Sequence, residues 1–204
     1  AFAAGLGVTA LLQSSTATGL MVTGFAAGGL VDLVPALAVM LGANVGTTLI
    51  VQVLSFDVSQ LSPLLILIGV VLFRRATEGL RDFGRVMIGL GLLLLALHQF
   101  VQLLTPYEDL PSLRMMLDAI STQPVLDVIL AAIVTWAAHS SVAVVLVIMS
   151  FAAQGTVPPE AALALVLGAN LGTALNPLFE GVRGGDPASK RVAVGNLVNR
   201  VAGV

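Results

Sequence analysis

The sequence predicts an all-α membrane protein with two inverted repeats, each containing a re-entrant helical hairpin and broken transmembrane helices. Three observations support this prediction: the apolar composition, an internal duplication and the distribution of the basic residues. Hydrophobic residues make up 57% of the 204 residues and charged residues 10%, against about 45–50% and about 25% in soluble domains. So few charges cannot cover a water-facing surface. We therefore expect a multi-pass protein of the cell (plasma) membrane, which in a bacterium is the inner membrane.

The composition also excludes several classes of protein. The net charge is −2 and no run of Lys or Arg exists, so no nucleic-acid partner is expected. The absence of cysteine rules out a disulfide framework, a thiolate metal site and a thiol nucleophile. The chain begins without Met inside one apolar run and stops inside another, so we expect it to be a portion of a longer protein.

The first part of the chain recurs in the second. Residues 13–48 align without a gap with residues 139–174, at an offset of 126, and 18 of the 36 pairs are identical. The matched motifs are Gln13-Ser14-Ser15 with His139-Ser140-Ser141, and Gly42–Thr47 with Gly168–Thr173. The abundance of Ala, Leu, Val and Gly explains some identities, but not two polar motifs in one register. The pattern therefore indicates a duplication.

Apolar runs predict the elements of each copy in order. The first copy covers 1–104, the second covers 125–204, and an extracellular linker at 105–124 joins them. In the first copy we expect a hairpin at about 1–31 and helices at about 34–54, 58–73 and 86–104. In the second copy we expect a hairpin at about 125–152, a helix at about 161–179 and the start of a further helix at 192–204.

The basic residues predict opposite orientations for the two copies. Eight of the nine lie in the segments 74–85 and 180–191 or at the C-terminal end, and only Arg114 lies in the linker. Cytoplasmic loops are rich in Lys and Arg, so both segments are predicted inside and the linker outside. From the linker outside, two full crossings by 125–152 and 161–179 would place the basic segment 180–191 outside, against the prediction. The conflict disappears if 125–152 enters and leaves the membrane on the outside, since each of its arms, of about 12 residues, is too short to span. Counting crossings back from the inside segment 74–85, the first hairpin at 1–31 opens on the inside.

The two hairpin turns carry the polar residues best suited to binding. A re-entrant turn ends one short helix and begins another, so unpaired N–H groups and a positive helix end face the protein centre. Two related turns that meet at one cavity would form an anion site without arginine, and hydroxyl and carbonyl oxygens would suit sodium. A Ser-Ser pair by itself more often bonds to its own backbone; its recurrence in matched places favours a site.

The Gly-Ala-Asn-x-Gly-Thr segments lie inside the helices that follow the hairpins. Two glycines four residues apart, each costing about 1 kcal/mol in a helix interior, indicate either a break or a close helix contact. Asn44 and Asn170 would cap or ligate at a break. The acidic residues lie in loops or at the ends of apolar runs, so no intramembrane carboxylate is expected.

No enzyme is predicted. A dyad of Ser14 or Ser15 with His139, as in an intramembrane hydrolase, has no evident acid and leaves the duplication unexplained. An anion channel and a purely structural bundle stay open as competing functions. Saturable uptake that depends on a sodium gradient would distinguish a carrier from a channel, and an anion bound at the turns would exclude the structural bundle.

The paired motifs resemble the type II sodium–phosphate cotransporter family, which has a Gln-Ser-Ser-Ser-type motif followed by Gly-Ala-Asn-x-Gly-Thr in each inverted repeat. The resemblance covers nearly the whole chain and includes Lys190–Ala193 and Asn196–Asn199. It implies uptake of inorganic phosphate coupled to sodium, by alternating access with an elevator-like motion. Phosphate, sodium and the lipid bilayer are the implied partners, and sodium is the coupling ion rather than a cofactor. Another small anion as cargo, and a homodimer, remain open.

The resemblance also implies roles by matching position. The implied phosphate-binding residues are Gln13, Ser14, Ser15, Thr16, His139, Ser140 and Ser141. The implied ion-binding or supporting residues are Asn44, Thr47, Thr48, Asn170 and Thr173, with sodium ligands among Gln13, Ser15, Thr47, Ser141 and Thr173. His139 replaces a family Gln, and we expect it to be neutral in the empty carrier. Thr16 and Val142 replace the third Ser of each motif, which leaves substrate and ion stoichiometry open.

Overall fold

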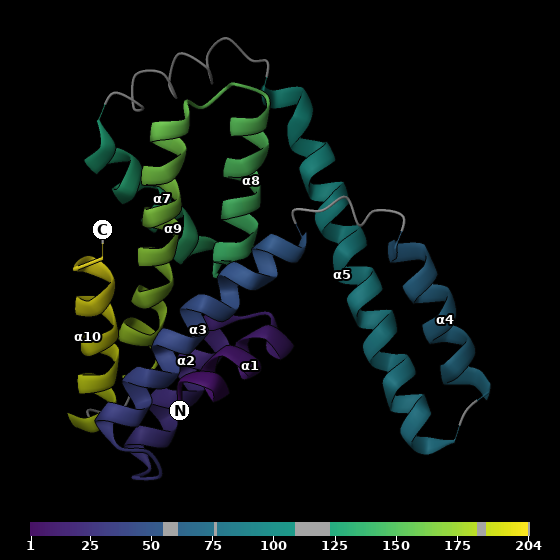
Figure 1. Ribbon diagram of the computed structural model, residues 1–204, viewed down its shortest axis with the longest axis horizontal. Coiled ribbons are helices and arrows are strands. Elements are labelled where there is room, and N and C mark those ends of the chain that lie inside the picture. Colours follow the sequence, from purple (N-terminus) through teal and green to yellow (C-terminus); the bar gives the residue numbers. More distant parts are fainter. Residues whose placement is uncertain (55–60, 76, 109–122, 183–186, 204) are drawn as a thin grey trace. The chain divides into compact units, whose positions relative to one another are not determined.

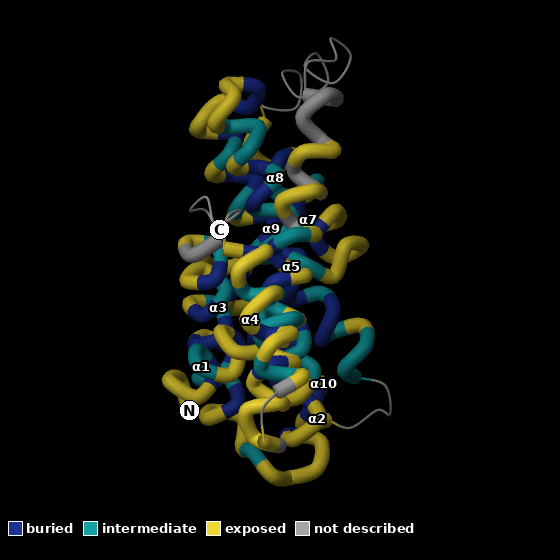
Figure 2. Tube along the Cα trace, turned by 90° about the vertical axis from the view of Figure 1, so that its right-hand side faces the viewer, coloured by how far each residue is buried: buried dark blue, intermediate teal, exposed yellow. Residues whose placement is uncertain are grey.

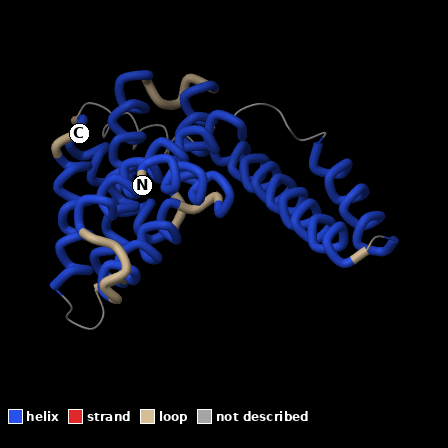
Figure 3. Tube along the Cα trace, turned by 60° about the horizontal axis from the view of Figure 1, so that its bottom comes forward, coloured by secondary structure: helices blue, strands red, loops and turns tan. Residues whose placement is uncertain are grey.

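Figure 1 shows a computed structural model of the chain, which describes residues 1–54, 61–75, 77–108, 123–182 and 187–203. Within these residues all regular structure is helical and no strand is present, as Figure 3 shows, which confirms the all-α prediction. The chain divides into two compact units. One contains residues 1–52 and 114–204, and the other contains residues 53–113.

The helices of the first unit repeat at the offset found in the sequence. In the first copy they are α1 (Phe2–Leu12), α2 (Ser15–Ala27) and α3 (Leu33–Leu54). In the second copy they are α7 (Pro124–Ala138), α8 (Ser141–Ala153), α9 (Pro159–Glu180) and α10 (Pro187–Val201). Adding 126 to the bounds of α2 and α3 gives those of α8 and α9. The same register therefore governs both helix boundaries and motifs.

Each hairpin ends in the same kind of helix termination. Gly29 and Gly155, which match at the offset, have φ of 70° and 71°, where glycine carries no Cβ penalty. Leu30 N–H donates to the Phe25 carbonyl at 2.9 Å, and Gly29 N–H donates to Ala26 at 3.1 Å, which is the Schellman pattern. These bonds stop the helix and turn the chain toward the next one.

The glycine pairs of the Gly-Ala-Asn-x-Gly-Thr segments are packing positions. A Cβ added to Gly42 would lie 2.0 Å from the Phe2 carbonyl oxygen on α1, and one added to Gly168 would lie 2.3 Å from the Val128 oxygen on α7. Both α3 and α9 continue as helix through the motif. Of the two alternatives expected at this motif, the structure shows the close helix contact and not the break, because the missing side chains let two backbones touch.

Among the described residues, two helices, α3 and α9, are long and apolar enough to cross a bilayer. Shorter apolar helices are α1, α4 (Leu61–Arg75), α7 and α8. Helix α7, with 15 residues, is about 22 Å long at 1.5 Å per residue, less than a hydrocarbon core of about 30 Å. Every described helix exposes large apolar side chains, and Figure 2 shows exposed positions, in yellow, along much of the tube. Such a surface suits lipid better than water.

The second unit pairs α4 (Leu61–Arg75) with α5 (Glu78–Glu108). Backbone contact is close at Gly84, where an added Cβ would lie 2.8 Å from the Gly69 carbonyl oxygen. The predicted loop at 74–85 is wrong, because most of it is helical. Arg81 and Arg85 lie on α5 with their guanidinium carbons 4.9 Å and 5.5 Å from the centre of the Phe73 ring, a contact that favours a tight turn.

Several predicted boundaries also shift. Helix α10 begins at residue 187 rather than 192, and α5 extends from 78 to 108 rather than from 86 to 104. The linker predicted at 105–124 is helical to 108, and its part at 109–122 lies outside the described residues, as do residues 55–60. The added residues at the helix ends include charged and polar side chains, so the apolar runs end before the helices do.

One buried pair differs between the copies and allows a direct test. Thr9 Oγ1 on α1 donates to Thr18 Oγ1 on α2 at 2.8 Å. In the second copy Thr135 matches Thr9 and Val144 matches Thr18, and the buried Thr135 Oγ1 has no hydrogen-bond partner among the described residues. Thr18→Val should therefore lower the free energy of unfolding by about 1–3 kcal/mol, and Val144→Thr should raise it by about 0.5–1.5 kcal/mol. Thermal unfolding of the purified full-length protein checks both. A stabilising Thr18→Val would contradict the account.

Candidate functional site

The two hairpin turns meet at one small cavity. It is lined by Gln13, Ser14, Ser15, Thr16, His139, Ser140, Ser141 and Val142, and its volume is about 20 Å³. All seven residues predicted from the turns therefore lie together, although 126 residues separate each from its match. The cavity has room for about one water molecule.

The geometry of the two turns is nearly identical. Gln13 and His139 each follow a helix in the left-handed conformation, with φ of 53° and 55°, and each is followed by an extended serine. Ser14 Oγ accepts from Ala17 N–H at 3.1 Å, and Ser140 Oγ accepts the equivalent bond at 3.2 Å. These serines are helix N-caps, so the expectation that a Ser-Ser pair bonds to its own backbone is correct for the first serine of each pair.

Both helix N-termini open toward this cavity. The caps engage the third N–H of α2 and of α8, which leaves the first two N–H groups of each helix without an intrahelical partner. Those N–H groups belong to Ser15 and Thr16 on α2 and to Ser141 and Val142 on α8. Four backbone donors and two positive helix ends at one cavity form an environment that favours an anion.

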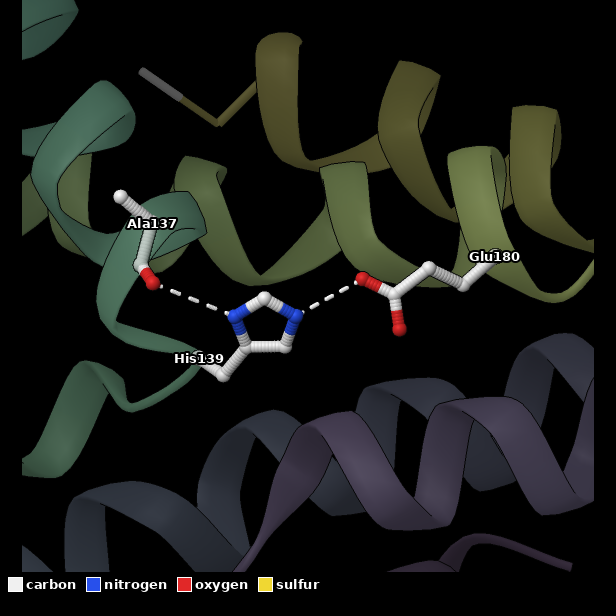
Figure 4. A network of polar contacts seen from close by, with 3 residues as sticks. All are labelled: Ala137, His139 and Glu180. Atoms are coloured by element: carbon white, nitrogen blue, oxygen red, sulfur yellow. Dashed lines mark hydrogen bonds and ion pairs between the residues drawn. The ribbon is translucent and has the colours of Figure 1, made fainter.

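His139, which lines the cavity, also contacts a carboxylate. Its Nε2 lies 2.8 Å from Glu180 Oε1 at the end of α9, and its Nδ1 lies 3.3 Å from the Ala137 carbonyl oxygen (Figure 4). A neutral imidazole has one N–H, whereas both nitrogens here face groups that accept when Glu180 is ionised. The contacts favour an imidazolium, contrary to the expected neutral His139. Glu180 was expected only as an acidic residue at the end of an apolar run, and its contact with the turn residue His139 was not predicted.

The same contacts do not support a serine–histidine dyad. A nucleophile needs its hydroxyl within hydrogen-bond reach of the base. Both ring nitrogens of His139 are directed instead at Ala137 and Glu180, and the hydroxyls of Ser14 and Ser140 accept bonds from the backbone.

The residues predicted to support the turns divide into two groups. Thr47 Oγ1 donates to the Ala43 carbonyl at 3.0 Å and Thr48 Oγ1 to the Asn44 carbonyl at 3.3 Å, so both bond to their own helix. Asn44, Asn170 and Thr173 all contact Arg200. The topology rule groups Arg200 with the basic residues of the cytoplasmic side; it is instead buried within the bundle, with 6% of its surface exposed.

Sequence reasoning missed several buried polar side chains in the second copy. Asp127 and Asn176 are 1% and 0% exposed. Asp127 Oδ2, both polar atoms of Asn176 and Thr135 Oγ1 have no hydrogen-bond partner within the described part of the chain. The position of Asp127 at the start of an apolar run concealed its burial. Asn176 precedes a proline inside an apolar run, and that dipeptide was the available signal.

Comparisons with known proteins give a consistent result. A family model described as Na+/Pi-cotransporter matches residues 1–102 and 110–198. Proteins named "Putative inorganic phosphate export protein YjbB" from Salmonella typhimurium and Escherichia coli are 44% identical to the whole chain, which spans 37% of their length. "Uncharacterized protein YqeW" from Bacillus subtilis is 28% identical over the whole chain, which spans 66% of its length. No solved structure matches.

Proposed function

Since the chain belongs to the Na+/Pi-cotransporter family, we propose that it forms the transport core of a carrier that takes up inorganic phosphate together with sodium. The observation that carries this proposal is the single cavity lined by both hairpin turns. Phosphate would occupy it, held by backbone N–H groups at two helix N-termini and by the hydroxyls of Ser15 and Ser141. Sodium would bind to hydroxyl and carbonyl oxygens nearby.

The size of this cavity supports a proposal of alternating access. A space of about 20 Å³ holds about one water molecule, so the two turns must separate before a tetrahedral anion can enter. Each turn belongs to a different copy, and a movement of one copy relative to the other would open the cavity. This is the elevator-like or rocking motion that we propose for the carrier.

We further propose that the two copies have opposite orientation in the membrane, with both hairpins re-entrant. Gly28 and Gln154 match at the offset, lie at the exposed bases of the hairpins and have negative φ. Cysteine at Gly28 should react with an impermeant reagent only from the cytoplasm, and cysteine at Gln154 only from outside. The chain itself has no cysteine, so only cysteines in the rest of the full-length protein need removal. Labelling of both positions from one side would refute the inverted arrangement.

Transport into proteoliposomes tests the function itself. The full-length protein should accumulate labelled phosphate only when sodium is higher outside, and accumulation should saturate with phosphate. Saturation together with dependence on the gradient distinguishes a carrier from an anion channel. Sulfate in place of phosphate should give little uptake, and if it is carried equally the cargo is a broader class of anion.

Export is a second candidate, favoured by the name that the 44% identical relatives bear. Vesicles loaded with phosphate distinguish the two directions. For uptake coupled to sodium, an inward sodium gradient should retain phosphate inside; for a dedicated exporter, phosphate should leave whatever the direction of that gradient. Loss of phosphate from loaded vesicles against an inward sodium gradient would reject the uptake proposal.

The pair of His139 and Glu180 predicts a pH-dependent affinity. An imidazolium at the cavity attracts an anion, and a neighbouring carboxylate favours that charged form. As pH rises and His139 loses its proton, wild-type affinity should fall while that of His139→Gln should not. The ratio of wild-type to variant Kd should rise by roughly tenfold between about pH 5.5 and 8. This ratio cancels the titration of phosphate itself.

The second histidine of the chain provides the control. His98 is exposed on α5 and contacts Gln102, so His98→Gln should follow the wild-type profile. A constant ratio for His139→Gln would show that the imidazole serves only as a neutral partner.

A further inference from the structure

Arg200 connects the two copies through their Gly-Ala-Asn segments. Its guanidinium, on α10, donates to Asn44 Oδ1 on α3. It also donates to the carbonyl oxygen of Asn170 and to Thr173 Oγ1 on α9, and its Nη1 lies 2.8 Å from Asn170 Oδ1. The side chain is almost fully buried. One basic group therefore holds matching asparagines from both halves of the duplication.

The chemistry of these acceptors is unusual for a buried arginine. A guanidinium in a protein keeps its charge, and a buried charge is normally paired with an opposite charge. Within the described ranges, no carboxylate oxygen lies within 4.0 Å of Arg200. Its partners are amide, carbonyl and hydroxyl oxygens, which are the groups that coordinate hard cations such as sodium.

The matching arginine of the first copy has a different environment. Subtracting 126 from 200 gives Arg74, which lies near the end of α4 and is exposed. An arginine therefore stands at the same offset in both copies, but only Arg200 is buried among the asparagine oxygens. This difference makes Arg74 a matched control for the loss of a basic residue.

We propose that Asn44, Asn170 and Thr173 form a monovalent-cation site, which Arg200 fills with its own guanidinium in place of free sodium. Two cations about 4 Å apart repel strongly outside bulk water, so guanidinium and sodium exclude each other from these oxygens. Sodium therefore competes with Arg200 for the site, and a neutral residue at position 200 opens the site to sodium. The inference goes beyond the proposed function, since it holds for any anion as cargo.

Thermal unfolding of the purified full-length protein tests the cation site without any transport assay. Wild type, Arg200→Gln, Arg200→Met and Arg74→Gln are compared in sodium chloride and in choline chloride at equal ionic strength. Both variants at position 200 should gain more from sodium than wild type does. The additional gain should be roughly 5–10 °C at a sodium concentration about 100 times the Kd. Arg74→Gln should respond to sodium as wild type does.

Two outcomes would overturn the proposal. The first is an equal response to sodium in wild type and in both variants at position 200, which would make Arg200 a structural tie between helices. The second is failure of both variants to fold even in sodium, because sodium is expected to take the place of the guanidinium. An absence of phosphate transport would reject the proposed function and leave the stability result unchanged, so the two failures are distinguishable.

Discussion

Alanine at Gly42 or Gly168 should lower the free energy of unfolding by about 3 kcal/mol or more, at the upper end of the cost of overpacking a core. The added Cβ would lie 2.0 Å from the Phe2 carbonyl oxygen in the first case and 2.3 Å from that of Val128 in the second. Both contacts are with backbone, so relief requires the helix that forms the first arm of the hairpin to move. Because that arm leads to the turn at the cavity, phosphate transport should fall with stability.

A matched glycine in the same unit provides the control. Gly24 lies inside α2, and a Cβ added there meets nothing within 4 Å. Gly24→Ala should be neutral or should stabilise the protein by up to about 1 kcal/mol, through helix propensity alone. Thermal unfolding of the purified full-length protein measures all three variants. Equal melting temperatures for Gly42→Ala and Gly24→Ala would contradict the packing role of the glycine pairs.

Alanine at Ser15 or Ser141 should weaken phosphate affinity by roughly tenfold to hundredfold. Each hydroxyl is buried and lies at the first position of a helix whose N-terminus lines the cavity. Removing a hydroxyl that bonds a buried charged ligand costs about 1–3 kcal/mol. The effect should appear in the Kd for phosphate, measured by equilibrium binding to the purified full-length protein. The matched positions should give similar losses, because the two turns have the same geometry.

Ser62 separates affinity from stability. It is also buried, and its Oγ donates to the Gly91 carbonyl at 2.7 Å inside the second compact unit. Ser62→Ala should lower the melting temperature and leave the phosphate Kd unchanged. If all three alanine variants lose stability and none loses affinity, the serines of the turns are structural and the cargo binds elsewhere.

Predictions based on short sequence patterns agree with the structure. Polar residues in the middle of an apolar run predict the turn at His139–Ser141, and α7 ends at Ala138. The offset of 126 predicts that the second copy repeats the first, and α8 and α9 repeat the bounds of α2 and α3. Such features depend on residues close together in the chain, where caps, glycines and apolar periodicity act directly. Duplication then carried each of them into the second copy.

Local reasoning failed where the decisive partner is distant. The glycine pairs fitted a break or a contact equally well from sequence, and only the position of α1 and α7 shows a contact. The count of basic residues predicted a loop that contains Arg74, Arg81 and Arg85. In the structure Arg81 and Arg85 lie instead near the start of helix α5, and their guanidinium groups pack on the Phe73 ring. A basic residue at a helix end and one in a loop give the same signal to a topology rule.

The sequence by itself determined the membrane character, the helical class, the duplication and the residues of the two turns. These follow from composition and from motifs that recur in one register. Only the tertiary structure decided that the turns share one cavity, that Glu180 pairs with His139, and that Arg200 binds Asn44 and Asn170. The two Arg200 contacts join residues that are 30 and 156 positions apart in the sequence, and the contact between His139 and Glu180 joins residues 41 positions apart. No local pattern encodes them, because they arise from the packing of whole helices, and a lone charged side chain then binds whatever oxygens that packing brings within reach.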